Sequence, residues 1–548
     1  MAGDKRENNF IRQGSLLAIG GIITRLIGLL YRSPLTNIVG DDGMGIYSAA
    51  YEIYNIALIV SVYSIPVAVS RLVALKDSKG EFINSSRIFK ISKLVSSSLG
   101  LAASLFLFLF ADQLATFLEH PNAEIPLRIL APTIFVFSIM GVYRGFFQGK
   151  KTMKPTVISQ LVEQIVNAIV SVGAALVLVA LTAESNQTSA WGAGGGTLGT
   201  LAGAFAGLIC LLIIYKKSQP KYKQLEAMDD TGKYDKASDT VKLLLLTMLP
   251  IIFSQTIYQI SGVIDTKLFG YLLKGNGFDQ KTVDDLWGIY SGKYKWLYNV
   301  PVAIASAFGV TIVPMLTGLF SNGLMDQVKE KLHSSMKFNL LIAIPSAAGL
   351  GFLGGPILQL IFRHECDDAA FLLTFGCLAV VFFAYSTFSN GVLQGIGGMR
   401  WPVIHSAISL VIHIPLTIIL VGTLNLGMTG MVIANVAYAL VICFLNYIKI
   451  SKLLNYRQEI RKSILKPTLC SIIMGAVALF VFKACMFVFG KIFSGNFLND
   501  ISTLISIFFA VVIYAFLLLK LKAVNEDDIV EFPSGVRIIR VLKKIHML

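Results

Sequence analysis

Charged residues are scarce in this chain. Only 14% of its 548 residues are Asp, Glu, Lys or Arg, against roughly 25% in a soluble domain. With 55% apolar residues and a mean hydropathy of +0.70, the composition excludes a soluble enzyme and a disordered protein. It predicts an all-α polytopic membrane protein.

Cysteine is also rare and carries no motif. The six cysteines include no CxxC pair, and neither they nor the six histidines show the spacing of a zinc site. This excludes a disulfide scaffold, and we expect free thiols, no metal and no cofactor. The cysteines are Cys210, Cys366, Cys377, Cys443, Cys470 and Cys485.

Paired carboxylates suited to catalysis are missing from the apolar segments. The adjacent acidic pairs, such as Asp41–Asp42 and Asp284–Asp285, are assigned to loops at the ends of such segments. We interpret them as solvated caps, which argues against a membrane glycosyltransferase. We expect a protein that is not an enzyme and has no catalytic residues.

Fourteen segments are long and apolar enough to be membrane spans, each needing about 20 residues. They are residues 13–38, 46–75, 91–113, 124–148, 155–181, 191–216, 242–273, 285–318, 333–354, 368–394, 401–422, 427–449, 466–489 and 500–521.

Basic residues orient these spans. With the N-terminus in the cytoplasm, 34 Lys and Arg residues fall in inner loops and tails, and six fall in outer loops. Because positive charge gathers on the cytoplasmic side, both termini are predicted to be cytoplasmic. The net charge of +15 then reflects topology, and no nucleic-acid partner is expected.

The two halves of the sequence repeat. GFFQGKKTMKP at 145–155 recurs as GVLQGIGGMRWP at 391–402, and GIYSAAY at 45–51 recurs as GIYSGKY at 288–294. Equivalent segments lie an even number of spans apart, so the repeat is parallel. This predicts two parallel six-helix lobes with a substrate site between them, as in transporters, plus two C-terminal helices.

The predicted organisation follows from this repeat. It comprises an N-lobe (1–220), a cytoplasmic linker (221–241), a C-lobe (242–450), spans 13 and 14 (451–522) and an amphipathic tail on the inner membrane surface (523–548).

Charges within the first two spans indicate a water-filled cavity inside the protein. A charge at bilayer depth costs at least about 2.5–3.5 kcal/mol on insertion scales, so it normally faces protein or water. Arg25 lies about 18 Å from the inner end of span 1 at 1.5 Å per residue, and Arg32 follows seven residues later. Glu52 and Asn55 share a face of span 2. Arg144, at the inner end of span 4, is interpreted as snorkelling to the surface.

Span 7 is unusually polar. One helical stripe holds Ser254, Tyr258, Ser261 and Asp265, and a second holds Gln255, Gln259, Gly262 and Thr266. Lys293 enters span 8 from outside. The predicted cavity residues are Arg25, Arg32, Glu52, Asn55, Gln255, Gln259, Asp265 and Lys293. Since arginine suits phosphate, the expected substrate is an anionic amphiphile.

These motifs resemble the multidrug/oligosaccharidyl-lipid/polysaccharide exporter superfamily. The resemblance rests on RQGSLLAIGGIITRLIGLLYRSPL near the N-terminus, the GDDGMGIYSAAYEIYNIALIVSVYSIPVAVSRLVA stretch, and the two glycine-glutamine-glycine motifs. Within the superfamily the chain is most similar to the polysaccharide transporter branch that includes lipid II flippases.

The resemblance implies a flippase that rocks between inward-open and outward-open states. Its cavity would bind the diphosphate and sugar of an undecaprenyl-linked saccharide, most simply lipid II, while the tail stays in lipid near helices 13 and 14. The implied partners are a lipid-linked oligosaccharide, membrane lipids and a coupling ion such as H⁺ or Na⁺, in a bacterial cytoplasmic membrane. The position of an arginine in span 2 of the lipid II flippases is Glu52 here, so flippases for capsule or teichoic units, and a cation-coupled drug exporter, stay open as alternatives.

Overall fold

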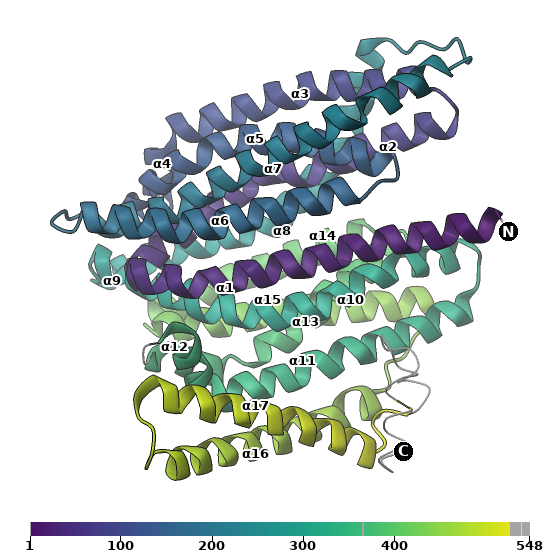
Figure 1. The fold of residues 1–548 in the computed structure, drawn as a ribbon. Coiled ribbons are helices and arrows are strands. Elements are labelled where there is room, and N and C mark those ends of the chain that lie inside the picture. The colour runs from purple at the N-terminus through teal and green to yellow at the C-terminus, as the bar shows by residue number, and fades with distance from the viewer. Residues whose placement is uncertain (1, 364–365, 526–538, 540–548) are drawn as a thin grey trace. The chain divides into compact units, whose positions relative to one another are not determined.

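The backbone is helical almost throughout. A computed structural model describes residues 2–363, 366–525 and 539, without the side chains of 2–19, 22, 29, 60, 62, 63, 250, 254, 257, 258 and 306–314. Within these residues, helices are joined by short turns (Figure 1). The predicted amphipathic tail (523–548) lies almost entirely outside the described residues.

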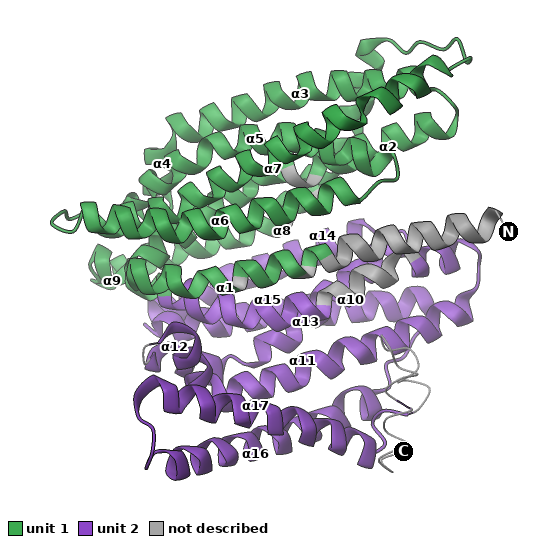
Figure 2. Ribbon diagram, in the orientation of Figure 1, with its two compact units in different colours: residues 1–288 green, residues 289–548 purple. Residues whose placement is uncertain are grey.

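The chain forms two compact units, residues 1–288 and 289–548 (Figure 2). The helices of unit 1 are α1 (Ala2–Leu58), η1 (Ile59–Ser64), α2 (Ile65–Ser78), α3 (Phe82–Leu109), α4 (Ala111–Phe117), η2 (Pro121–Ala123), α5 (Glu124–Gly149), α6 (Lys154–Leu181), α7 (Thr188–Ala227), α8 (Ala237–Gly275) and α9 (Gln280–Gly288).

Unit 2 begins where α9 gives way to a π-helical segment. Its helices are η3 (Ile289–Lys295), α10 (Trp296–Ser321), α11 (Met325–Phe362), α12 (Asp367–Phe375), α13 (Leu378–Gly395), α14 (Arg400–Thr417), η4 (Ile418–Thr423), α15 (Gly427–Leu454), η5 (Arg461–Leu465), α16 (Lys466–Phe489) and α17 (Gly495–Lys520).

Nine described helical segments are long and apolar enough to cross a membrane, and a tenth is formed if α12 and α13, bent by 57°, count as one span. They cover predicted spans 3–6 and 9–14. The structure therefore supports an all-helical membrane protein, and the count of fourteen is not confirmed. The four remaining predicted spans fall on α1–α2, α8 and α9–α10, the helices that carry the predicted cavity residues.

A glycine breaks the long first helix. Gly40 has φ 74° and ψ −179° within α1, a conformation that glycine adopts without steric cost. The break lies between predicted spans 1 and 2. Residues 2–39 and the stretch from 41 through α2 are therefore two separate helical stretches.

Small residues set the packing of unit 1. A Cβ added at Gly195 of α7 would lie 2.6 Å from Cα of Ala175 on α6, and one at Gly203 would lie 2.6 Å from the carbonyl oxygen of Glu163. Glycines at these positions let two membrane helices approach closely, where dispersion rather than the hydrophobic effect favours association.

The compact units and the predicted lobes divide the chain at different places. The units are defined by contacts and place α8 and α9 with the N-terminal helices. The lobes are defined by the sequence repeat, which assigns the same helices to the second half. The predicted lobes therefore stay a proposal, and the contacts of α8 and α9 are described within unit 1.

Candidate functional site

Two repeat-related glycines meet where α1 crosses α9. A Cβ added to Gly45 would collide with the carbonyl oxygen of Asp284, and a Cβ added to Gly288 would collide with that of Asp41. Both pairs obey the offset of 243 residues between GIYSAAY and GIYSGKY. Such a reciprocal contact is the arrangement expected where a twofold pseudo-axis passes between equivalent helices.

Farther along α1, Glu52 packs against α8. A Cβ on Gly262 would collide with the Glu52 carboxylate, so the half-buried Glu52 faces the stripe of Gln255, Gln259 and Gly262. Both glutamines are half-buried. Asp265, one turn beyond Gly262, is 3% exposed. The packing thus brings Glu52 to the polar side of α8.

The two arginines of α1 differ in their surroundings. The Arg32 guanidinium lies 5.0 Å from the Tyr47 ring centroid and donates to Ser48 Oγ at 3.5 Å. Its Nε is buried with no hydrogen-bond partner among the described residues. Arg25 is exposed. Arg32 therefore has both an aromatic support and an unused donor.

The remaining predicted site residues are Asn55 of α1 and Lys293. Asn55 is half-buried one turn after Glu52. Lys293 lies in the π-helical segment η3 of unit 2, is 7% exposed, and its ammonium is 5.9 Å from the Phe362 ring centroid. π-Helical turns recur at functional sites. The site residues as a set remain a proposal.

Two interpretations of charged groups were wrong. Arg144 does not snorkel, because its Nη2 lies 2.6 Å from Glu163 Oε2 and its Nε donates to Ser159 Oγ at 3.1 Å, with both ionic side chains largely buried. Asp284 is not a solvated cap, because it is 2% exposed and its Oδ1 lies 2.5 Å from Nδ1 of the buried His120. Sequence spacing gave no sign of either partner, since the two members of each pair lie on different elements of the fold.

A second polar network surrounds Glu119, in the turn before η2. Lys267 and Lys274 of α8 donate to its carboxylate at 2.5 and 3.0 Å. Burial would raise the pKa of Glu119, but the hydrogen bonds from the two lysines outweigh it, and the net pKa is lowered. The network ties the α4–η2 turn to the end of α8.

The lowered pKa predicts a pH-dependent contribution to stability. It is fully present above the ordinary pKa of 4.5 and is lost as the pH falls through the lower value of the folded chain. Glu119→Gln should therefore lower the free energy of unfolding by about 1 kcal/mol at neutral pH and by much less near pH 3.5. Thermal unfolding of both proteins at the two pH values measures this; an equal difference at both would contradict it.

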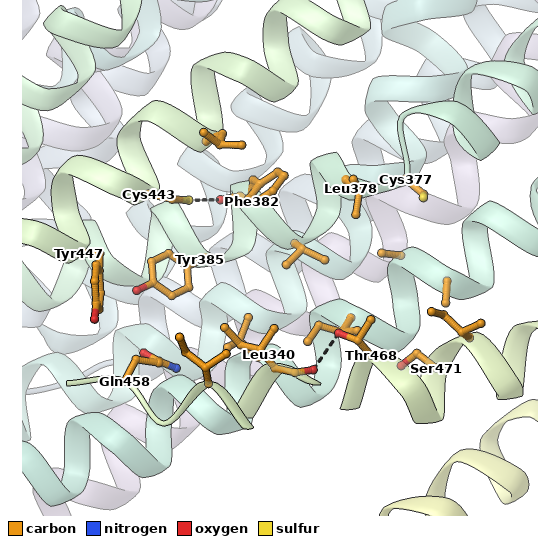
Figure 3. Close-up of a pocket in the computed structure, with 18 of the residues that line it drawn as sticks. Leu340, Cys377, Leu378, Phe382, Tyr385, Cys443, Tyr447, Gln458, Thr468 and Ser471 are labelled. Carbon is orange, nitrogen blue, oxygen red and sulfur yellow. Dashed lines mark hydrogen bonds between the residues drawn. The ribbon is translucent and has the colours of Figure 1, made fainter. Parts of the chain in front are cut away.

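An apolar cavity of about 660 Å³ lies within unit 2 (Figure 3). Its size falls within the range of small-molecule sites. Tyr385, Tyr447 and Gln458 gather at one end of it, and the Gln458 amide has no hydrogen-bond partner among the described residues. The apolar lining comes chiefly from α11, α13, α15 and α16 and includes Leu340, Ile344, Phe352, Leu378, Phe382, Phe444, Ile464 and Ile472.

Among the described residues, no group of three or more His, Cys, Asp or Glu side chains is placed to hold a metal ion. Unit 1 offers buried charge and hydrogen-bonding groups, and unit 2 offers an apolar cavity.

Comparison with known proteins places these features in context. The sequence pattern described as "Polysaccharide biosynthesis protein" matches residues 10–320, and the MatE pattern matches residues 297–419. The chain is 26% identical over 500 residues to the lipid II flippase MurJ of Bacillus subtilis (strain 168), covering 88% of this chain and 89% of the relative. It is 23% identical over 539 residues to stage V sporulation protein B of the same organism, covering 97% and 99%.

The fold is also that of a solved structure. A lipid II flippase MurJ in an inward closed conformation superposes with a TM-score of 0.64 at 17% identity, covering 92% of this chain and 99% of the other. At that identity the likeness concerns the fold.

Proposed function

Because the chain belongs to the polysaccharide biosynthesis protein family of the multidrug/oligosaccharidyl-lipid/polysaccharide exporter superfamily, whose members are transporters and not enzymes, we propose that it is a lipid flippase. It moves an undecaprenyl-diphosphate-linked saccharide from the inner to the outer leaflet of a bacterial cytoplasmic membrane by alternating access. Lipid II is the proposed substrate, because a lipid II flippase is among its full-length relatives.

The observation that carries this proposal is the charged and polar face formed by α1 and α8. Glu52 packs on Gly262 beside two glutamines, and Arg32 keeps an unused buried donor. Groups of this kind are expensive in lipid unless they face protein, water or a polar ligand. The arginine fork suits a diphosphate, with which it makes paired charge-assisted hydrogen bonds.

The cavity of unit 2 supports the lipid character of the substrate. Its lining is almost entirely apolar, and α16, which supplies part of it, follows the repeated region of the sequence. An apolar chain could occupy this space while a sugar head group binds elsewhere. We propose that Arg25 and Arg32 hold the diphosphate and that Glu52, Asp265 and Lys293 exchange ion pairs between states.

The MatE match favours one alternative, a cation-coupled multidrug exporter. It covers a shorter part of the chain than the polysaccharide biosynthesis match. An exporter of cationic drugs would also need an excess of acidic groups, whereas the proposed site residues include three basic groups (Arg25, Arg32 and Lys293) against two carboxylates (Glu52 and Asp265). A flippase for capsule or teichoic units differs only in its head group.

Rescue of a depleted strain tests the proposed substrate. Expression of this chain in bacteria depleted of their lipid II flippase should restore growth, whereas Arg32→Ala should not. Strains lacking a flippase for another polymer serve as the comparison. Rescue only of those strains would reassign the head group, and drug efflux without rescue of any would favour the exporter.

A further inference from the structure

A buried histidine–carboxylate pair lies beside the crossing of α1 and α9. His120 is fully buried, and its Nδ1 lies 2.5 Å from Asp284 Oδ1. Gln280 Nε2 donates to the same carboxylate oxygen at 2.9 Å. His120 Nε2 is buried and has no hydrogen-bond partner among the described residues.

The pair has only two plausible charge states. With a neutral imidazole donating from Nδ1, the Asp284 carboxylate leaves one net negative charge in a site that is 0–2% exposed. Uptake of one proton at Nε2 gives an imidazolium–carboxylate pair with no net charge. Burying an uncompensated charge is far more expensive than burying a hydrogen-bonded pair.

Carboxylates dominate the elements packed around this pair. Asp41 and Asp42 lie on α1, and Asp285 follows Asp284 on α9. The Asp42 carboxylate accepts hydrogen bonds from the Gly43 amide at 2.8 Å and from the Ser189 hydroxyl. Other charged groups on neighbouring elements include Asp265 on α8 and Lys281 on α9. Glu119 in the adjoining turn is paired with Lys267 and Lys274 of α8, and Glu124 is paired with Arg128 on α5.

The pair is mechanically linked to the glycine crossing. The backbone carbonyl oxygen of Asp284 packs against Gly45, and the carboxylate of the same residue contacts His120. We propose that the His120–Asp284 pair is a proton-binding site whose occupied state holds α9 against α1. When the proton leaves, the carboxylates of α1 and α9 repel one another and the crossing loosens.

This inference goes beyond the proposed flippase activity and does not depend on which molecule is moved. Under the predicted topology the pair exchanges its proton with the outer solution. The ligand is therefore the proton itself. The equilibrium between a closed and a loosened crossing of α1 and α9 then responds to the pH outside the membrane.

The chain contains its own reporter of this site. The Trp287 ring lies 6.2 Å from the His120 ring, and a protonated imidazole quenches indole fluorescence. The purified full-length protein should lose Trp287 emission as the pH falls through roughly 5 to 8, the range in which histidine changes charge. The Trp287 component is obtained as the difference between the wild type and Trp287→Phe.

Matched variants separate the site from other histidines. His120→Gln keeps a donor toward Asp284 but cannot titrate, so its Trp287 emission should not change with pH. His405→Gln is the control, because His405 is also buried and lies 5.8 Å from the Trp401 ring but bonds an amide oxygen of Asn446. It should leave the Trp287 transition intact.

Hydrogen exchange tests the link to the crossing. After correction for intrinsic rates, amides of residues 41–47 and 280–288 should exchange about threefold to tenfold more slowly at the low-pH end, as expected from relieving repulsion between nearby charges. His120→Gln should abolish this difference. The proton site would be overturned if Trp287 emission showed no pH transition, or if the transition persisted in His120→Gln. The link to the crossing would be overturned if the amide exchange rates did not change with pH. If His120→Gln fails to fold, the difference between wild type and Trp287→Phe still decides whether the pair titrates.

Discussion

Gly45→Ala and Gly288→Ala are each expected to destabilise the folded chain by about 3 kcal/mol or more, the upper part of the range for overpacked sites. In each case the new Cβ would collide with a backbone carbonyl oxygen, of Asp284 or of Asp41. Backbone cannot rotate away as a side chain can, so α1 and α9 must separate. Thermal unfolding of the detergent-solubilised protein, followed by size-exclusion chromatography, measures the loss.

Gly173→Ala is the matched control for both variants. Gly173 lies within α6 of the same unit, and a Cβ there would meet nothing within 4 Å. Alanine is favoured over glycine inside a helix by about 1 kcal/mol, so this variant should be neutral or more stable. Equal stability of Gly45→Ala and Gly173→Ala would contradict the close crossing.

Arg32→Ala is expected to reduce lipid transport about 100-fold, which corresponds to about 2.7 kcal/mol, within the range for a hydrogen bond to a charged group. Arg25→Ala should abolish transport as well if both guanidinium groups hold the diphosphate. Both proteins should still insert, because Arg25 is exposed and the Arg32 Nε has no hydrogen-bond partner among the described residues. Initial rates in proteoliposomes, normalised to inserted protein, give the comparison.

Two further substitutions make this prediction specific. Arg32→Lys keeps the charge but loses the planar fork, so it should transport at an intermediate rate. Arg128→Ala removes an exposed arginine that pairs with Glu124 on the surface of α5, and it should transport like the wild type. Full activity of Arg32→Ala would remove that residue from the proposed site.

Much of the fold could be predicted from the sequence because membrane spans depend on local composition. The apolar segments 155–181 and 466–489, for example, correspond closely to α6 and α16. The polar spans were harder to confirm, since α1 and α8 carry the charges that lower their hydropathy. The prediction of fourteen spans therefore rests on loop charge, which the helices alone do not test.

The contacts between helices were less accessible from sequence. Arg144 and Glu163 are 19 residues apart, and His120 and Asp284 are 164 apart, so no helical spacing relates them. One signal for Asp284 did exist. Asp41–Asp42 and Asp284–Asp285 share the offset of 243 residues that relates GIYSAAY to GIYSGKY, which marked these acidic pairs as parts of the repeat rather than as unrelated solvated caps.

The most direct test of the proposed function is a leaflet-accessibility measurement with one defined substrate. Proteoliposomes would contain a fluorescent undecaprenyl-diphosphate-linked saccharide and a reagent, added outside, that cannot cross the membrane. The wild type should expose the inner-leaflet pool to the reagent, while Arg32→Ala and protein-free liposomes should keep it protected. Protection equal to that of protein-free liposomes in the presence of folded wild-type protein would contradict the assignment as a lipid-linked saccharide flippase.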